Sequence, residues 1–523
     1  MKDPLLYAQR RIGPLLRDRR TIASAAAVCL TATVCYLYVL VGNINNYDNI
    51  ACTPAGYGTG LRSGRWLLTL LGDAYSHFLG NYNLPLFNGL VGLLFLGLAC
   101  QLLFRTLRLE QPWQCALLSV ITVAFPAAAS AMLFSFTVHY YLLAVLLASA
   151  SVWLVTRRGT GCFILSAVLL CCSIGLYQAY FPLAAAVLVL RLLRDCLDEA
   201  QKWKTVALRA LRYVGMLAAA MILYFLVLRL CLAVYHESLL PYRGIDRMGL
   251  LPLDRLPELL WREIRCFYLL AWENYAFLAP TRLVRWAICG SVGLSALWLI
   301  LNRHERDPKK LVTVLLLLAA LPIAANGIFL MAPDAETHTL MTYGVVTLFY
   351  LPLIVLSGTR RHSNTTRRWV GLLTALCLLG AAIGYAWQAN GCYRTNYYAN
   401  RVISSYYQTM LTRAKNVEGY TAQTEIVFVG RHLNDPSLHD VWADTPFIFD
   451  GRSTASGQIN EYSRVEMIAA YLGTQTRYAT DEELATYAAE FDTMPCYPDD
   501  GAIRLLDGTL YIKLCDPSYT SFD

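Results

Sequence analysis

The chain has 523 residues, of which 56% are hydrophobic and only 15% are charged. Its mean hydropathy is positive, and such a composition is too apolar for a soluble protein of this length. We therefore expect a polytopic membrane protein. The net charge of +8 follows mostly from basic residues that flank membrane spans, and we expect no nucleic-acid partner.

Eleven apolar stretches are long enough to cross the hydrocarbon core of a bilayer, which takes about 20 helical residues. They predict a polytopic α-helical membrane protein with about 11 transmembrane helices. The predicted spans lie near residues 21–42, 83–104, 115–134, 137–156, 162–178, 180–195, 213–235, 283–302, 311–332, 341–357 and 369–387.

Basic residues predict the orientation, because positively charged loops stay on the cytoplasmic side of a membrane. If the N-terminus is inside, the inner segments carry many basic residues, such as Arg105 and Arg158, whereas the short outer connection at 333–340 carries none. No cleavage pattern follows the first span, so we expect it to be a retained anchor. By the parity of eleven crossings, the C-terminal segment lies outside.

Residues 388–523 differ in character from the membrane domain of residues 1–387, because they are polar and patterned like a globular domain. The run "EIVFVG" predicts a buried strand, and "INEYSRVEMIAAYLG" predicts an amphipathic helix. Asp507 and Gly508 stand between two alternating runs, which is typical of a tight hairpin. We expect a small extracytoplasmic α/β or α+β domain.

Two outer loops, at 43–82 and 236–281, are longer than ordinary connections, and long loops are often functional. Each contains an apolar stripe at helical spacing, which predicts an interfacial helix that lies on the bilayer. The first stripe consists of Trp66, Leu67, Leu70, Leu71, Ala74 and Phe78. The second consists of Leu256, Leu259, Leu260, Ile264, Phe267 and Leu270.

Five short motifs resemble, in their order and in their spacing relative to the spans, the GtrII-type glucosyl transferase family of the GT-C class. They are "NYDN" at 46–49, "SGRWLL" at 63–68, "IGLYQAYFP" at 174–182, "HTLMTYG" at 338–344 and "MPCYPDDGAIRLLDGTLYIKL" at 494–514. The resemblance implies transfer of a hexose, typically glucose, from a polyprenyl-phosphate donor such as an undecaprenyl-phosphate sugar. The implied acceptor is a lipid-linked or surface glycan, such as an O-antigen or cell-wall polymer. The implied location is the outer face of a bacterial cytoplasmic membrane, in contact with membrane lipid.

Asp48 is the predicted catalytic residue, because displacement of a sugar phosphate by a hydroxyl needs a base to take the acceptor proton. It follows the first span directly, and the resemblance assigns this role to an acidic residue of the first outer loop. The alternative is a turn aspartate that caps its own backbone. The next residue is Asn49 and not a second acid, which puts a Mg or Mn cofactor in doubt because one carboxylate is a poor site for either ion.

Arginines are the predicted ligands of the donor phosphate, since a guanidinium matches the geometry of a phosphate. Arg65 in "SGRW" is the first candidate, and Arg62, Arg243 and Arg247 are further candidates. The alternative for each arginine is that it interacts only with anionic lipid headgroups. Arg62 fits that alternative better than Arg65 does.

Tyr177 and Gln178, at the outer end of the fifth span, are predicted to bind sugar hydroxyls, although such residues are also common at membrane interfaces without a function. Glu273 and Asp73 are reserve acids in the substrate site, with a solvated surface position as the alternative.

Two other functions are compatible with the same composition. A transporter or flippase of lipid-linked sugars usually shows internal repeats and polar or broken helices at the midplane, and neither is visible in the sequence. A membrane receptor or scaffold with an outer sensing domain would not depend on Asp48. A disulfide among Cys392, Cys496 and Cys515 is left open by the sequence.

Overall fold

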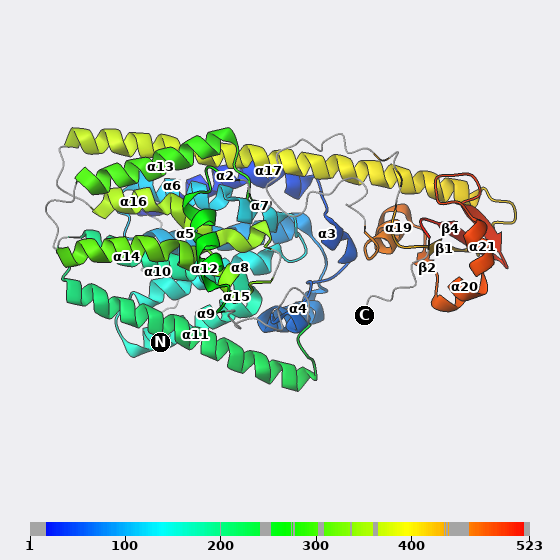
Figure 1. The fold of residues 1–523 in the computed structure, drawn as a ribbon, viewed down its shortest axis with the longest axis horizontal. Helices are drawn as coiled ribbons and strands as arrows, with labels where there is room; N and C mark the ends of the chain where they lie inside the picture. Colours follow the sequence, from blue (N-terminus) through cyan, green and yellow to red (C-terminus); the bar gives the residue numbers. More distant parts are fainter. Residues whose placement is uncertain are drawn as a thin grey trace. The chain divides into compact units, whose positions relative to one another are not determined.

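The computed structural model describes residues 17–198, 200–240, 253–273, 275, 278–301, 308–334, 337–358, 364–433, 435, 438 and 460–516. The chain divides into two compact units, which are drawn in Figure 1. The first unit comprises Met1–Val41, Tyr57–Asn390 and Pro446–Asp450, and the second comprises Gly42–Gly56, Gly391–Thr445 and Gly451–Asp523. The predicted first outer loop, 43–82, is thus shared between the two units.

The first unit is helical throughout its described part. Its helices are α2 (Arg19–Val41), η1 (Leu61–Ser63), α4 (Trp66–Leu79), α5 (Pro85–Thr106), α6 (Pro112–Ala124), α7 (Pro126–Met132), α8 (Val138–Val155), α9 (Thr160–Leu176), η2 (Gln178–Tyr180), α10 (Phe181–Leu197), α11 (Trp203–Tyr235), α12 (Leu256–Tyr268), α13 (Arg282–Leu301), α14 (Pro308–Ala325), α15 (Ile328–Met331), η4 (Thr339–Val346), α16 (Thr347–Gly358) and the first part of α17 (Asn364–Lys415).

The prediction of a polytopic helical membrane protein is confirmed. Among the described residues, eight helices are long and apolar enough to cross a membrane, and the bent pair α6 and α7 would make a ninth. The other two predicted spans coincide with α9 and α10, which have 17 residues each. The pair α6 and α7 bends by 49° where Pro126 begins the second helix, because proline cannot donate the backbone hydrogen bond of a continuous helix.

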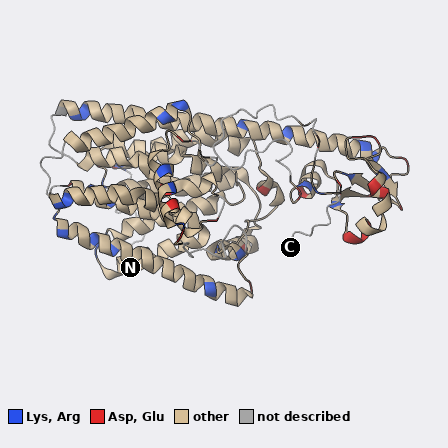
Figure 2. Cartoon of the chain, in the orientation of Figure 1, with Lys and Arg blue, Asp and Glu red and all other residues tan. Residues whose placement is uncertain are grey.

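In the first unit, α10 packs against α8, α11, α14 and α16, α5 packs against α8, and α2 packs against α6; Figure 1 shows the long helices of this unit side by side. Figure 2 shows few charged residues along the lengths of these helices, with Lys and Arg mostly near helix ends. At one such end, the fully buried carboxylate of Asp195 lies 2.7 Å from Arg209, 3.3 Å from Arg191 and 3.4 Å from Arg108. A buried carboxylate requires such partners.

Both predicted loop helices are present, as α4 and α12. In α4, Trp66, Thr69 and Gly72 are buried against the protein, whereas Leu70, Ala74 and Phe78 are exposed at intervals of four residues. An exposed apolar stripe of this kind fits a helix that contacts the bilayer surface. In α12 the predicted stripe faces the protein instead, because Leu259 and Phe267 are buried there together with Glu263 and Cys266. The prediction that this stripe lies on the bilayer is therefore wrong.

The second unit contains α3 (Tyr47–Ala51), the end of α17, and a mixed sheet in the order β2-β1-β4-β3. Its other elements are β1 (Glu425–Val429), α19 (Arg464–Leu472), β2 (Thr476–Tyr478), α20 (Asp481–Thr486), α21 (Ala488–Thr493), β3 (Ile503–Leu506) and β4 (Thr509–Lys513). Strand β1 is parallel to β2 and β4, and β3 is antiparallel to β4. A small sheet region at the C-terminus is present as predicted, but the unit also includes residues 42–56, which the sequence assigned to the membrane domain.

The predicted hairpin is also confirmed. Asp507 and Gly508 link β3 to β4, and both have positive φ values, 47° and 84°. This geometry belongs to the tight turn that matches the twist of a hairpin, and it favours Asp followed by Gly.

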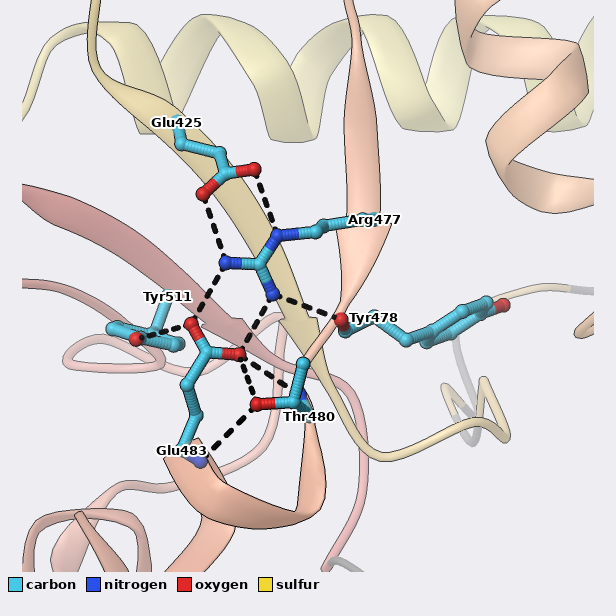
Figure 3. A network of polar contacts seen from close by, with 6 residues as sticks. All are labelled: Glu425, Arg477, Tyr478, Thr480, Glu483 and Tyr511. Atoms are coloured by element: carbon cyan, nitrogen blue, oxygen red, sulfur yellow. Dashed lines mark hydrogen bonds and ion pairs between the residues drawn. The ribbon is translucent and has the colours of Figure 1, made fainter. Parts of the chain in front are cut away.

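One polar network, shown in Figure 3, joins the edge of the sheet to α20. The guanidinium of Arg477 donates to Glu425 at 2.7 and 2.8 Å and to Glu483 at 2.7 and 2.8 Å. Thr480 and Glu483 also form a capping box at the start of α20, and such boxes satisfy free backbone donors at a helix start. Hydrogen bonds from Arg477 lower the pKa of Glu483 to about 2.

All sixteen cysteines lie within the described residues, and no disulfide joins any two of them. The disulfide that the sequence left open among Cys392, Cys496 and Cys515 is therefore not present in this structure.

Candidate functional site

Asp48 lies in the short helix α3 of the second unit. Asn46 caps this helix, because its side-chain oxygen accepts a hydrogen bond of 2.8 Å from the backbone N–H of Asn49. Asn46 is fully buried, so the start of the helix is fixed by a buried polar contact. Asn46 thus supplies local capping of the kind that the alternative interpretation assigned to Asp48.

The Asp48 carboxylate accepts a hydrogen bond from the hydroxyl of Tyr462, a residue 414 positions further along the chain. The ring of Tyr462 also packs edge-on against Tyr47, with ring centroids 6.1 Å apart. Partial burial, followed by the nearby Asp48 charge, raises the pKa of Tyr462. The tyrosine therefore stays protonated at neutral pH and donates to the carboxylate, which orients it.

Helix α3 is held in place by the core of the second unit. Ile50, which is 2% exposed, belongs to a buried cluster with Ile403 and Tyr407 of α17 and Ile468 of α19. Asn49 is fully buried, and its carbonyl oxygen accepts a hydrogen bond of 2.7 Å from Thr53. Asn49 is therefore a buried residue that contributes to the structure of the turn beside Asp48.

Arg65 lies in the first unit at the start of α4, after the left-handed turn at Gly64. Gly64 has a φ of +77°, and a Cβ there would lie 2.7 Å from both the Gln178 amide nitrogen and the Tyr224 hydroxyl. The carbonyl oxygen of Gly64 accepts a hydrogen bond of 3.0 Å from Tyr224. Only glycine combines this conformation with such close neighbours, which explains the glycine of the "SGRW" motif.

Tyrosine rings surround the guanidinium of Arg65. Its central carbon lies 4.8 Å from the ring centroid of Tyr177 and 6.0 Å from that of Tyr141. Its Nη1 donates to the Tyr141 hydroxyl at 3.4 Å. Contacts between a cation and an aromatic face hold the plane of an arginine in a defined orientation.

Gln178 completes this cluster. Its side-chain nitrogen donates to the carbonyl oxygen of Ser63 at 2.8 Å and approaches the Tyr224 hydroxyl at 3.2 Å. The structure therefore brings together three of the predicted site residues, Arg65, Tyr177 and Gln178, from segments more than 100 residues apart. Gln178 thus contacts the backbone of the turn that directly precedes Arg65.

The other predicted phosphate ligands do not join this cluster in the described part of the chain. Arg62 is exposed, and its Nε lies 3.5 Å from the carboxylate of Glu237. Arg243 and Arg247 lie outside the described residues.

The two reserve acids take part in separate pairs. Asp73 accepts a hydrogen bond of 2.8 Å from Tyr57. Glu273 accepts hydrogen bonds from Arg265 at 2.7 Å and Tyr275 at 2.8 Å, and these contacts lower its pKa. Both acids therefore pair with side chains near them in the sequence, outside the Arg65 cluster.

Glu263 is a candidate functional residue that the sequence prediction missed. Its side chain is 0% exposed, and neither carboxylate oxygen has a hydrogen-bond partner among the described residues. Burial raises its pKa to about 8. Buried acids with strongly raised pKa values are frequent at functional sites. A signal was present, because Glu263 lies four residues after Leu259 and four before Phe267, within the apolar stripe of α12.

A search of the described residues finds no group of three or more His, Cys, Asp or Glu side chains that could hold a metal ion.

The family model described as glucosyl transferase GtrII matches residues 37–349, a segment that contains both Asp48 and the Arg65 cluster. No curated protein and no solved structure matches the chain. Because the matched segment covers more than half of the 523 residues, the chain belongs to the GtrII glucosyl transferase family.

Proposed function

We propose that this membrane glycosyltransferase moves a glucosyl residue from a polyprenyl-phosphate donor to a surface glycan, on the extracytoplasmic face of a bacterial cytoplasmic membrane. Membership of the GtrII family supports glucose as the transferred sugar. The convergence of Arg65, Tyr177 and Gln178 in one cluster is the observation that carries the assignment of a donor site.

The donor half of the proposal rests on the surroundings of Arg65. When the bond between C1 of the sugar and the phosphate oxygen breaks, negative charge grows on the departing phosphate. A fixed guanidinium stabilises such charge because it is already oriented when the reaction occurs. The rings of Tyr177 and Tyr141 provide that orientation for Arg65.

A surface position next to lipid suits a donor whose phosphate lies at the depth of the headgroups. The exposed stripe of Leu70, Ala74 and Phe78 belongs to α4, the helix that begins directly after Arg65. An interfacial helix of this kind holds its first residues near the membrane surface. Arg65 would then meet the phosphate while the polyprenyl chain remains in the bilayer.

The acceptor half rests on Asp48. In the proposed reaction the carboxylate takes the proton of an acceptor hydroxyl, and the hydroxyl oxygen forms a bond with C1. The bond from C1 to the phosphate oxygen breaks, and its electron pair leaves with the phosphate, which Arg65 stabilises. The hydrogen bond from Tyr462 orients Asp48. Since a single carboxylate beside Asn49 is a poor site for Mg or Mn, the proposal assigns the phosphate charge to arginine.

The test is transfer of radiolabelled glucose from polyprenyl-phosphate glucose to glycan purified from cells that lack the protein, using the full chain in proteoliposomes. We expect Asp48→Asn to reduce transfer at least 100-fold, because loss of a general base typically costs about 10²–10⁴ in rate. Arg65→Ala should lower the rate of transfer at a given donor concentration. Arg65→Lys should be more active than Arg65→Ala but less active than wild type, since lysine lacks the planar fork of the guanidinium.

Glu482→Gln is the matched control for Asp48→Asn, because Glu482 is an exposed acid in the same unit. Full activity of Asp48→Asn, with the control also active, would refute Asp48 as the base. Movement of lipid-linked glucose across the membrane without formation of a glycosidic bond would instead indicate a flippase.

A further inference from the structure

A polar groove in the second unit has no role in the chemistry described above. It has a volume of about 340 Å³ and lies between residues 42–44 and one side of α17. The residues that α17 contributes include Tyr397, Arg401, Ser404 and Gln408. Their spacing of three to four residues places them in one line along the helix.

The opposite side of α17 belongs to the core of the same unit. Ile403, Tyr407 and Met410 are 0% exposed and pack in the cluster that also contains Ile50 of α3. The helix therefore presents an apolar face to the core and a polar face to the groove. Because the core fixes the helix, the polar side chains of the groove are attached to a rigid element.

Hydrogen bonds also fix the other wall of the groove. Asn43 has a φ of +45°, and its carbonyl oxygen accepts a hydrogen bond of 3.1 Å from the Asn45 side chain. The same Asn45 nitrogen lies 2.7 Å from the Tyr471 hydroxyl. Asn400 of α17 donates to the carbonyl oxygen of Asn45 at 2.9 Å, which ties this wall to the helix.

The chemistry of the lining favours a polyhydroxyl ligand. Amides and hydroxyls, such as those of Asn43, Ser404 and Gln408, both donate and accept hydrogen bonds, as sugar hydroxyls require. Tyr397 adds an aromatic ring, and the guanidinium of Arg401 lies 5.4 Å from its centroid and donates to its hydroxyl at 2.9 Å. Among the described residues, the lining contains no carboxylate, which disfavours a cation, and most of its residues carry amide, hydroxyl or guanidinium groups that an acyl chain would leave without partners.

The groove is also close to Asp48 along the chain. Ile44, which is buried and lines the groove, precedes Asp48 by four residues. Four residues span at most about 14 Å between Cα atoms, and the contacts of Asn45 and Asn46 fix the path between them. A glycan bound in the groove would therefore need only a few sugar rings to reach the Asp48 carboxylate.

We propose that this groove binds sugar units of the acceptor glycan and so presents the acceptor hydroxyl to Asp48. The proposal rests on the glucosyl transfer proposed above, and it adds a binding site for the acceptor as distinct from the donor.

The first experiment separates use of the acceptor from use of the donor. Ser404→Trp fills the groove, and Thr412→Trp is the matched control because Thr412 is an exposed residue of α17 that does not line the groove. Two measurements are made on the full chain in proteoliposomes: transfer of glucose to glycan purified from cells that lack the protein, and hydrolysis of polyprenyl-phosphate glucose by water.

We expect Ser404→Trp to reduce transfer at least tenfold, mainly through a higher acceptor KM, and to change hydrolysis less than twofold. Gln408→Ala, which only removes an amide, should raise the acceptor KM about threefold to tenfold without changing the melting temperature. Unchanged acceptor KM values in both variants would overturn the proposal. An equal fall in hydrolysis and transfer for Ser404→Trp would also overturn it.

A second measurement does not depend on catalysis. Saturation-transfer NMR of the full chain in nanodiscs, with methyl α-D-glucopyranoside, methyl α-L-rhamnopyranoside and N-acetylglucosamine as probes, reports sugar binding directly. Signal from at least one sugar that persists in Thr412→Trp and disappears in Ser404→Trp supports the groove, even if no transfer is found. If wild-type protein transfers glucose but gives no such signal, the glucosyltransferase assignment stands and the groove assignment is wrong.

Discussion

The substitution Glu263→Gln tests whether the buried acid of α12 is held protonated in the folded protein. Burial moves the pKa of Glu263 from 4.5 to about 8. Between these two values the folded chain binds a proton that the unfolded chain has lost, so the free energy of unfolding falls as the pH rises. At about 1.4 kcal/mol for each pH unit, the upper limit of this loss is about 5 kcal/mol. Glutamine has a similar shape and does not ionise, so the variant should escape the loss.

The assay is thermal unfolding of the purified full chain in detergent, followed by tryptophan fluorescence at several pH values from 5 to 8.5. Relative to wild type, Glu263→Gln should be similar at pH 5 and clearly more stable at pH 8.5. Glu258→Gln is the control, because Glu258 lies in the same helix with its side chain 72% exposed. If the unfolding curves of wild type and Glu263→Gln shift in parallel with pH, Glu263 is not protonated as its burial requires.

Three further substitutions test the second unit. Tyr462→Phe removes the hydroxyl that donates to Asp48. Loss of a hydrogen bond to a charged group costs about 1.5–3 kcal/mol, so transfer should slow about tenfold or more, without a lower melting temperature. An unchanged rate of transfer would show that the reaction does not use this contact. Ile50→Ala should destabilise the core of this unit by about 2–5 kcal/mol, measured by proteolysis of the full chain in urea, and equal resistance would contradict the packing. Glu483→Gln removes one of the two carboxylate partners of Arg477, so the variant should be less stable at pH 7 by about 1–2 kcal/mol, allowing for solvent screening. Because the pKa of Glu483 is lowered to about 2, the difference in stability between wild type and variant should be present above about pH 4.5 and should shrink as the pH falls toward 2. A difference in stability that does not depend on pH would refute the role of the Glu483 charge.

Features governed by local sequence were predictable. Apolar runs identified the membrane helices, the spacing of Leu70 and Phe78 identified the loop helix α4, and Asp507 with Gly508 identified the hairpin. Each of these signals lies within about 20 residues, because helices and tight turns are stabilised by near neighbours in the sequence. The length of α17 was less accessible, since hydropathy marks the end of a membrane span near residue 387, whereas the helix continues to Lys415.

The candidate site was predicted in part. Arg65, Tyr177 and Gln178 were selected separately, by residue type and position relative to the spans, and the structure shows that they form one cluster. Tyr224, which contacts Gln178 and the carbonyl oxygen of Gly64, was not predicted, because nothing near it in the sequence of α11 distinguishes it from other tyrosines in the apolar helices. Glu263 was missed for a different reason. The apolar stripe of α12 was recognised, but the acid that lies between Leu259 and Phe267 on the same face was not singled out.

Asp48 shows most clearly what local reasoning omits. The sequence places Asp48 and Arg65 in one outer loop, yet the contacts of Ile50 assign residues 42–56 to the second unit, with the end of α17 and the sheet. The hydroxyl that orients Asp48 belongs to Tyr462, and the polar line from Tyr397 to Gln408 borders the same segment. A short loop that leaves the first span therefore depends for its conformation on residues more than 350 positions away. This dependence gives the C-terminal region a function in the proposed chemistry: it fixes the conformation of the loop that carries the base, and it supplies the surface on which the acceptor is proposed to bind.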